Sequence, residues 1–268
     1  MSNHLLRSHA PLTDGNWELI DDEARERLGA ALAARKLVDF TGPLGWEYSA
    51  TNLGRVEPVS SAPCDGVSAL RRRVLPLAEV RAQFTLSRDE LRDDDRGAPD
   101  ADLEPLDRAA HQMAVAENRA VFHGWTEAGM AGISQVSPHG GLTLGEDPDG
   151  YPRPVARAVE RLLQAGVGGP YAVAFGADEY TRVAQSTEHS GHLLRDHLAR
   201  ILGGPVVWAP GVSGAIVLSL RGGDFVFESG QDLSIGYLDH DRDTVTLYLE
   251  QSFSFHVATP EAAVPLSG

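Results

Sequence analysis

The amino-acid sequence predicts an α+β protein with a long C-terminal β-hairpin and an extended arm. Residues 225–255 carry the longest period-two alternation of apolar and polar side chains, which is typical of half-buried strands. Residues 17–36 and 105–121 instead repeat apolar residues at helical spacing. A third segment, residues 56–84, is β-prone and charged but too poor in core residues to fold alone.

Composition limits the possible functions. At 268 residues, 42% of them apolar, the chain can form one large domain or two interleaved domains. Its 23 Lys and Arg against 38 Asp and Glu give a net charge of −15, which argues against a nucleic-acid partner. Cys64 is the single cysteine, so no intramolecular disulfide can form, and we expect a cytoplasmic protein. The N-terminus does not resemble a signal peptide, and no apolar run approaches the roughly 18 residues of a membrane span.

The first expected helix follows a polar arm of about fifteen residues and begins near Trp17. Acidic residues near its start, and Arg35 and Lys36 near its end, have the signs that the helix dipole favours. The simplest interpretation is a core helix that docks by its apolar stripe. That stripe consists of Trp17, Ile20, Ala24, Leu28, Ala31 or Leu32, and Arg35.

The segment that follows reads as a two-stranded excursion. Pro58, Pro63 and Pro76 exclude it from the middle of a sheet because proline cannot donate to a ladder. The basic run 71–73 is interpreted as a solvated surface, since the acidic excess elsewhere disfavours nucleic-acid contact. With so little core of its own, this excursion is expected to lie on another subunit.

The middle of the chain alternates helices and short strands. An acidic turn at residues 91–102 precedes a helix in which Pro105 lies in the first turn and Gly124 is the C-cap. Residues 125–154 are rich in Gly, Pro and Ser and are expected to be loop. We then predict helices at 155–163, 177–185 and 193–202, and strands at 172–175, 206–209 and 215–220.

The C-terminal hairpin is expected to consist of two long strands, 225–237 and 245–255, joined by the polar loop 240–243. Pro260 and Pro265 are then expected to end the regular structure.

One cluster could bind a metal. Glu188, His189, His192 and His197 are residue types that ligate zinc or iron, although exposed loop histidines explain the same pattern. The chain contains no G-x-S-x-G motif and no phosphate-binding loop. We therefore expect no catalytic residues, no metal and no cofactor.

Several sequence blocks follow one another along the whole chain: SHAPLTDGNWELIDDEAR, ARKLVDFTGPLGWEYSA, LPLAEVRAQFTLSRDEL, AENRAVFHG, GPYAVAF, RGGDF and GQDLSIGY. Together they resemble the encapsulins, the linocin-like shell proteins of bacterial and archaeal nanocompartments. The resemblance implies the Hong Kong 97 (HK97) type of phage capsid fold. It assigns residues 1–45 to an N-terminal arm and helix, 46–83 to the extended loop, 84–134 and 221–268 to the peripheral domain, and 135–220 to the axial domain.

The resemblance also implies a non-enzymatic subunit that forms an icosahedral cage, with sixty copies in the smaller members. The cage would hold a cargo enzyme, such as a dye-decolourising peroxidase or a ferritin-like protein, by a C-terminal targeting peptide. On spacing alone, Leu233, Ile235 and Tyr237 could belong either to this binding groove or to the core. The groove is expected at Leu28, Ala31, Leu32, Arg35, Asp39, Asp232, Leu233, Ile235 and Tyr237.

A five-fold pore is the second implied site. It would be lined by Thr187, Glu188, His189, Ser190, Gly191 and His192, whose polarity is otherwise explained by exposure.

Two departures from the family pattern stand out. Members typically have a Tyr-Pro pair where this chain has His192 and Leu193, so the resemblance does not predict the shape of the pore. No aromatic near residues 87–90 could stack a flavin. The alternative functions are a phage or prophage major capsid protein and a metal-dependent hydrolase using Glu188, His189 and His192.

Overall fold

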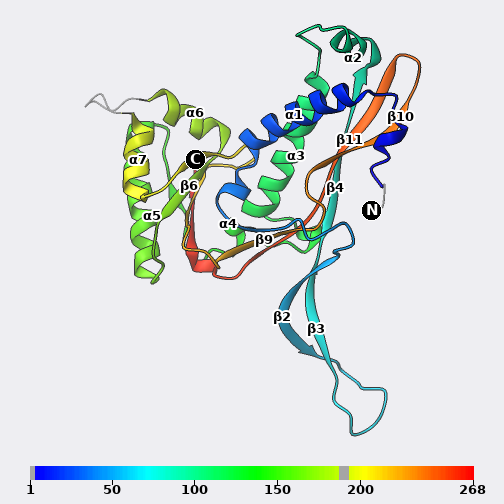
Figure 1. The fold of residues 1–268 in the computed structure, drawn as a ribbon. Helices are drawn as coiled ribbons and strands as arrows, with labels where there is room; N and C mark the ends of the chain where they lie inside the picture. The colour runs from blue at the N-terminus through cyan, green and yellow to red at the C-terminus, as the bar shows by residue number, and fades with distance from the viewer. Residues whose placement is uncertain (1–3, 187–192) are drawn as a thin grey trace.

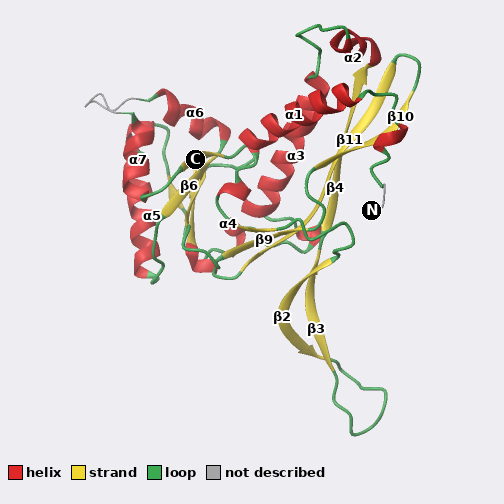
Figure 2. Ribbon diagram, viewed as in Figure 1, coloured by secondary structure: helices red, strands yellow, loops and turns green. Residues whose placement is uncertain are grey.

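The computed structural model describes residues 4–186 and 193–268 and consists of two five-stranded sheets, helices packed on them, and a two-stranded arm (Figures 1 and 2). In Figure 1 the arm projects away from the rest of the chain. No helix within the described residues is long and apolar enough to cross a membrane.

The first sheet is built around its longest strand, β11. The N-terminal part of β11 pairs antiparallel with β4 on one side and β10 on the other, and its C-terminal part pairs with β9. Strand β1 pairs parallel with β9 and extends the sheet. The strands are β1 (Asp39–Thr41), β4 (Ala78–Ser87), β9 (Phe225–Ser229), β10 (Ser234–His240) and β11 (Thr244–Val257).

The predicted hairpin is confirmed as β10 and β11, but its expected first strand is broken into β9 and β10. The break is stabilised by local hydrogen bonds at Asp232, whose Oδ1 accepts from the Leu233 N–H at 2.8 Å. The Ser234 hydroxyl also donates to the Asp232 carbonyl at 2.8 Å. Such side-chain-to-backbone bonds compete with the sheet ladder.

The second sheet contains the C-terminal strand. Its order is β5-β12-β8-β6-β7. Pro265 lies within β12 opposite Ile216, so the expectation that it ends the regular structure is wrong. Strand β5 pairs only with Leu266 and Ser267, which leaves Pro265 without a neighbour on that side. The strands are β5 (Leu142–Thr143), β6 (Tyr171–Phe175), β7 (Val206–Trp208), β8 (Ala215–Ser219) and β12 (Ala263–Ser267).

The first helix, α1 (Asp14–Ala31), is shorter than predicted. It begins at Thr13, whose hydroxyl accepts from the Asn16 N–H at 3.1 Å. It ends at Ala31 because buried Asn118 binds the chain there: its Oδ1 accepts from the Ala33 and Ala34 N–H groups, both at 3.1 Å. Arg35 therefore lies in a separate 3₁₀ turn, η2 (Ala34–Lys36), and not on the helix.

The remaining helices mostly match the prediction. Gly124 has a φ of 88° just after α3, as expected of its C-cap position. The expected acidic turn is wrong in its first half, because the Ser87 hydroxyl caps a short helix there. The expected loop 125–154 contains α4 and β5. The helices are α2 (Arg88–Asp95), α3 (Glu104–Phe122), α4 (Ile133–Val136), α5 (Pro152–Gln164), α6 (Ala177–Gln185) and α7 (Leu194–Leu202).

The expected two-stranded excursion is found as the arm β2 (Ala50–Pro58) and β3 (Leu70–Pro76), an antiparallel pair in a sheet of its own. Its expected bounds are wrong at the end, because residues 78–84 lie in β4 and pair with β11 in the first sheet. Large apolar side chains on it, including Val56, Leu70 and Val74, are at least half exposed. The chain then returns into the first sheet at β4.

Candidate functional site: a groove between α1 and β10

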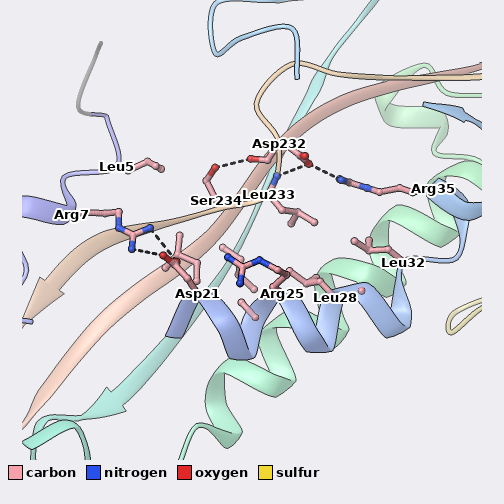
Figure 3. A pocket seen from close by; sticks show the side chains of 14 residues that line it. Leu5, Arg7, Asp21, Arg25, Leu28, Leu32, Arg35, Asp232, Leu233 and Ser234 are labelled. Carbon is pink, nitrogen blue, oxygen red and sulfur yellow. Dashed lines mark hydrogen bonds and ion pairs between the residues drawn. The ribbon is translucent and has the colours of Figure 1, made fainter. Parts of the chain in front are cut away.

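A cavity of about 510 Å³ lies between α1 and the segment that leads into β10. We call it the α1–β10 groove. Figure 3 shows Leu32 on the helical side and Leu233 on the opposite side. The groove is lined by Leu5, Arg7, Asp21, Ala24, Arg25, Leu28, Gly29, Leu32, Arg35, Asp232, Leu233, Ser234, Ile235 and Leu249.

The base of the groove is aliphatic. Ala24, Leu28 and Leu32 recur every four residues, so one face of α1 and the turn after it points toward the sheet. From the sheet, Ile235 lies opposite Leu249 in the β10–β11 register. These side chains are at least nine-tenths buried within the chain, and their remaining surface is available to a ligand.

Arg35 lies at one end of the groove and binds three groups. Its Nε donates to both carboxylate oxygens of Glu117, at 3.1 and 3.0 Å. Its Nη1 donates to Asp232 Oδ1 at 2.6 Å, and its Nη2 donates to Gln251 Oε1 at 2.6 Å. The guanidinium thereby joins η2, α3, β11 and the edge of the groove.

Burial and ion pairing together set the pKa values of Arg35 and Glu117. Burial by itself lowers the pKa of Arg35, but the Glu117 and Asp232 carboxylates outweigh it and raise that pKa above its ordinary value. Glu117 is completely buried, and burial raises its pKa although Arg35 opposes the shift. Asp232 is 38% exposed and faces the groove.

The N-terminal segment closes the other end. The Tyr237 N–H donates to the Leu5 carbonyl at 2.8 Å, which fixes this segment beside β10. Arg7 forms two hydrogen bonds with Asp21 on α1, at 3.1 and 2.7 Å, and stacks over Trp17. Figure 3 shows the Arg7–Asp21 pair at the opposite end from Arg35.

Gly29 also lines the groove, from within α1. A Cβ built at this position would meet no atom within 4 Å, and the position is exposed. Glycine inside a helix costs about 1 kcal/mol relative to alanine. No contact in the described chain requires this residue to be small.

The structure brings together Leu28, Leu32, Arg35, Asp232, Leu233 and Ile235 of the predicted groove residues. It does not place the other three on the groove. Ala31 is buried at the end of α1. Asp39 accepts from the Gly223 N–H at 2.7 Å beside a separate cavity of about 200 Å³. Tyr237 forms a hydrogen bond with His240 Nδ1 at 2.5 Å.

Sequence reasoning missed eight lining residues. Ala24 was assigned to the stripe that docks the helix, and the same helical spacing could have indicated Asp21, Arg25 and Gly29. Leu249 could have been found from the hairpin register. The sequence carries no signal for Leu5 and Arg7, whose positions depend on how the N-terminal segment folds back. The eight are Leu5, Arg7, Asp21, Ala24, Arg25, Gly29, Ser234 and Leu249.

The second expected site, Thr187–His192, lies outside the described residues. Of the candidate metal cluster that the sequence offers, His197 alone is described, on α7. Among the described residues, no three His, Cys, Asp or Glu side chains lie close enough to hold a metal ion.

Comparison with known proteins identifies the family. The family model described as "encapsulating protein for peroxidase" matches residues 2–254. The chain belongs to the encapsulins. Type 1 encapsulin shell proteins from Rhodospirillum rubrum and Mycobacterium tuberculosis are 45% and 43% identical to it, over 99% of this chain and 97% and 99% of theirs. This encapsulin is thus a structural shell protein and not an enzyme.

Solved structures show the same fold at low sequence identity. A virus-like particle from Pyrococcus furiosus aligns with a TM-score of 0.65 at 16% identity, covering 92% of this chain and 97% of that one. The capsid of an empty GTA particle aligns with a TM-score of 0.53 at 16% identity, covering 88% and 89%. The encapsulin therefore has the HK97 type of capsid fold, as the sequence resemblance implied.

Proposed function

We propose that this encapsulin assembles with copies of itself into a closed icosahedral shell of sixty subunits. The shell holds a cargo enzyme by a C-terminal targeting peptide bound in the α1–β10 groove. The observation that carries the proposal is the groove itself, an aliphatic cleft with an arginine–carboxylate pair at each end, on a shell-protein fold. Aliphatic peptide side chains would anchor in it, and the end charges would fix their register.

The arm supports self-assembly. Its side chains Val56, Leu70 and Val74 are at least half exposed within the described part of the chain, and burial against a neighbouring subunit would remove them from water. In this proposal 46–83 is the extended loop, 84–134 and 221–268 the peripheral domain, and 135–220 the axial domain. Strand β12 is an exception to this division, because its pairing with β8 of the second sheet supports grouping it with the axial domain.

The family description supports a peroxidase as cargo, and a ferritin-like protein is the alternative. The pore at Thr187–His192 and a cytoplasmic location complete the proposal. A virion capsid protein would share the fold, but the relatives of more than 40% identity are named encapsulin shell proteins.

Co-expression in a heterologous host tests the proposal. The encapsulin is expressed alone and with a fluorescent reporter that carries a randomised C-terminal tail. We expect uniform icosahedral particles in both cases and internal fluorescence for a subset of tails. Particles that load no tail would contradict the cargo function, and soluble monomers would contradict the shell.

A further inference from the structure

The edge of β10 along the groove has unused hydrogen-bonding groups. In the antiparallel β10–β11 pair, Ile235 lies opposite Leu249 and Tyr237 lies opposite Leu247. The Tyr237 N–H points away from β11, because it donates to the Leu5 carbonyl at 2.8 Å. Backbone groups two residues apart on a strand face the same side, so those of Ile235 also point away from β11.

Within the described part of the chain, these Ile235 groups have no partner. Across residues 4–186 and 193–268, neither its N–H nor its C=O forms a hydrogen bond on the outward side. Ile235 as a whole residue is nevertheless only 3% exposed, so its backbone lies in a largely desolvated place. Unpaired backbone groups in such a place favour a partner, since leaving them unpaired costs about 1–3 kcal/mol.

We propose that the groove binds its peptide as an added β-strand along the edge of β10, with main-chain hydrogen bonds to the N–H and C=O of Ile235. The added strand lies along the same edge of β10 at which the Leu5 carbonyl accepts a hydrogen bond from the Tyr237 N–H. Alternate side chains of the peptide then point toward α1, where Leu28 and Leu32 contact them. Gly29 leaves room for the peptide to approach the helix closely.

This inference rests on the proposed cargo function and deepens it. Strand addition predicts the spacing of anchors in the ligand, because successive residues of a strand face opposite sides. Aliphatic residues should recur at every second position of a bound tail. A helical ligand would instead place them three and four residues apart.

The randomised reporter library tests this directly. Loaded particles are purified, and the tails enriched in them are sequenced. We expect aliphatic residues at period two. Enriched tails with period three to four, or with no period, would overturn strand addition while leaving cargo capture intact. Failure of every tail to load would overturn the cargo function itself.

A matched pair of variants tests the main-chain bond. Ile235→Pro removes the outward N–H, and Ile235→Ala keeps it while also shortening the side chain. Proline is tolerated on an edge strand when its missing N–H faces outward. Among assembled particles, we expect Ile235→Pro to load an enriched reporter about ten-fold less than Ile235→Ala, as expected for a lost interaction of about 1.4 kcal/mol. Equal loading would overturn the proposal.

Hydrogen exchange gives a readout that does not depend on substitution. In wild-type particles, the Ile235 amide should exchange more slowly when the enriched reporter is loaded than when the particle is empty. The Leu238 amide lies beyond the groove on the same strand and is expected to be unchanged. Equal exchange at Ile235 in both particles would contradict strand addition.

Discussion

The guanidinium of Arg35 holds the carboxylate of Asp232 at the end of the α1–β10 groove, with Nη1 and Oδ1 2.6 Å apart. The same guanidinium neutralises Glu117, which is fully buried in α3. One side chain therefore stabilises the core and positions a charged group at the groove.

Arg35→Met should destabilise the subunit strongly, because it leaves Glu117 buried and unpaired. Removing one partner of a buried ion pair costs about 3–5 kcal/mol. Urea unfolding measures the loss. The double variant Arg35→Met with Glu117→Gln should recover part of it, since the orphaned charge is gone. Arg25→Met, at an exposed pair with Asp22, is the control and should cost less than about 1 kcal/mol.

Leu233→Asp should empty the particles without preventing their assembly. The new carboxylate would lie in the aliphatic groove, where a bound peptide would desolvate it. We expect at least a roughly ten-fold loss of loaded reporter per particle. Leu238→Asp is the matched control, because Leu238 is 48% exposed on β10, which begins just after Leu233, and does not line the groove. Equal loading of the two variants would reject the groove as the cargo site.

Gly29 permits a test in which stability and loading move in opposite directions. Gly29→Ala should raise the free energy of unfolding by up to about 1 kcal/mol, because alanine favours the helix. Gly29→Phe should fill the groove and reduce loading without lowering the melting temperature. Glu26→Phe, exposed on α1 but away from the groove, should load normally. Normal loading of Gly29→Phe would show that the occupant does not approach α1.

Shortening the arm should produce folded subunits that do not close into shells. Asn52 pairs with Val74, so residues 53–73 can be replaced by an Asn-Gly turn without touching β4. Circular dichroism would report the retained fold, and electron microscopy would report assembly. Replacing the exposed Cys64 at the tip of the arm by Ser is the control and should leave particles unchanged. Particles of normal size from the shortened chain would contradict the role of the arm.

Stability should fall as the pH falls below about 6.5, partly because of His123. Its Nε2 accepts from the Ser213 N–H at 3.0 Å, and burial lowers its pKa with help from Arg119. A lowered pKa means that the unfolded chain binds the proton more readily, so the stabilisation present above the unfolded pKa is lost on acidification. Burial also lowers the pKa of His256, which adds to the same trend.

Urea midpoints measured between about pH 7.5 and about pH 5.5 check the pH prediction. The dependence on pH should be weaker in His123→Gln than in the wild type. An unchanged slope would show that His123 does not contribute.

Hydrophobic periodicity in the sequence predicted the elements whose residues are close together in the chain. The period-two residues around Leu247 and the helical spacing around Met113 were sufficient for the hairpin and for α3. The end of α1 was not predictable, because it depends on Asn118, which is far along the chain. Strand β12 was missed because Pro265 pairs with β8 on one side and lies outside the β5 pairing on the other, an arrangement that only the assembled sheet reveals.

The groove was predicted on the sides that come from regular elements. The family resemblance placed Leu28, Leu32 and Ile235 on the groove; helical spacing and strand alternation agree with these positions, but spacing alone does not separate groove from core. Leu5 and Arg7 were not predictable, since their contacts with Tyr237 and Asp21 are tertiary.

The most direct test of the account is cryo-electron microscopy of particles loaded with an enriched reporter. We expect a closed shell of sixty subunits with peptide density in the groove between α1 and β10, on the inner surface. Loaded particles in which that groove is empty, or a chain that remains monomeric in solution, would contradict the account.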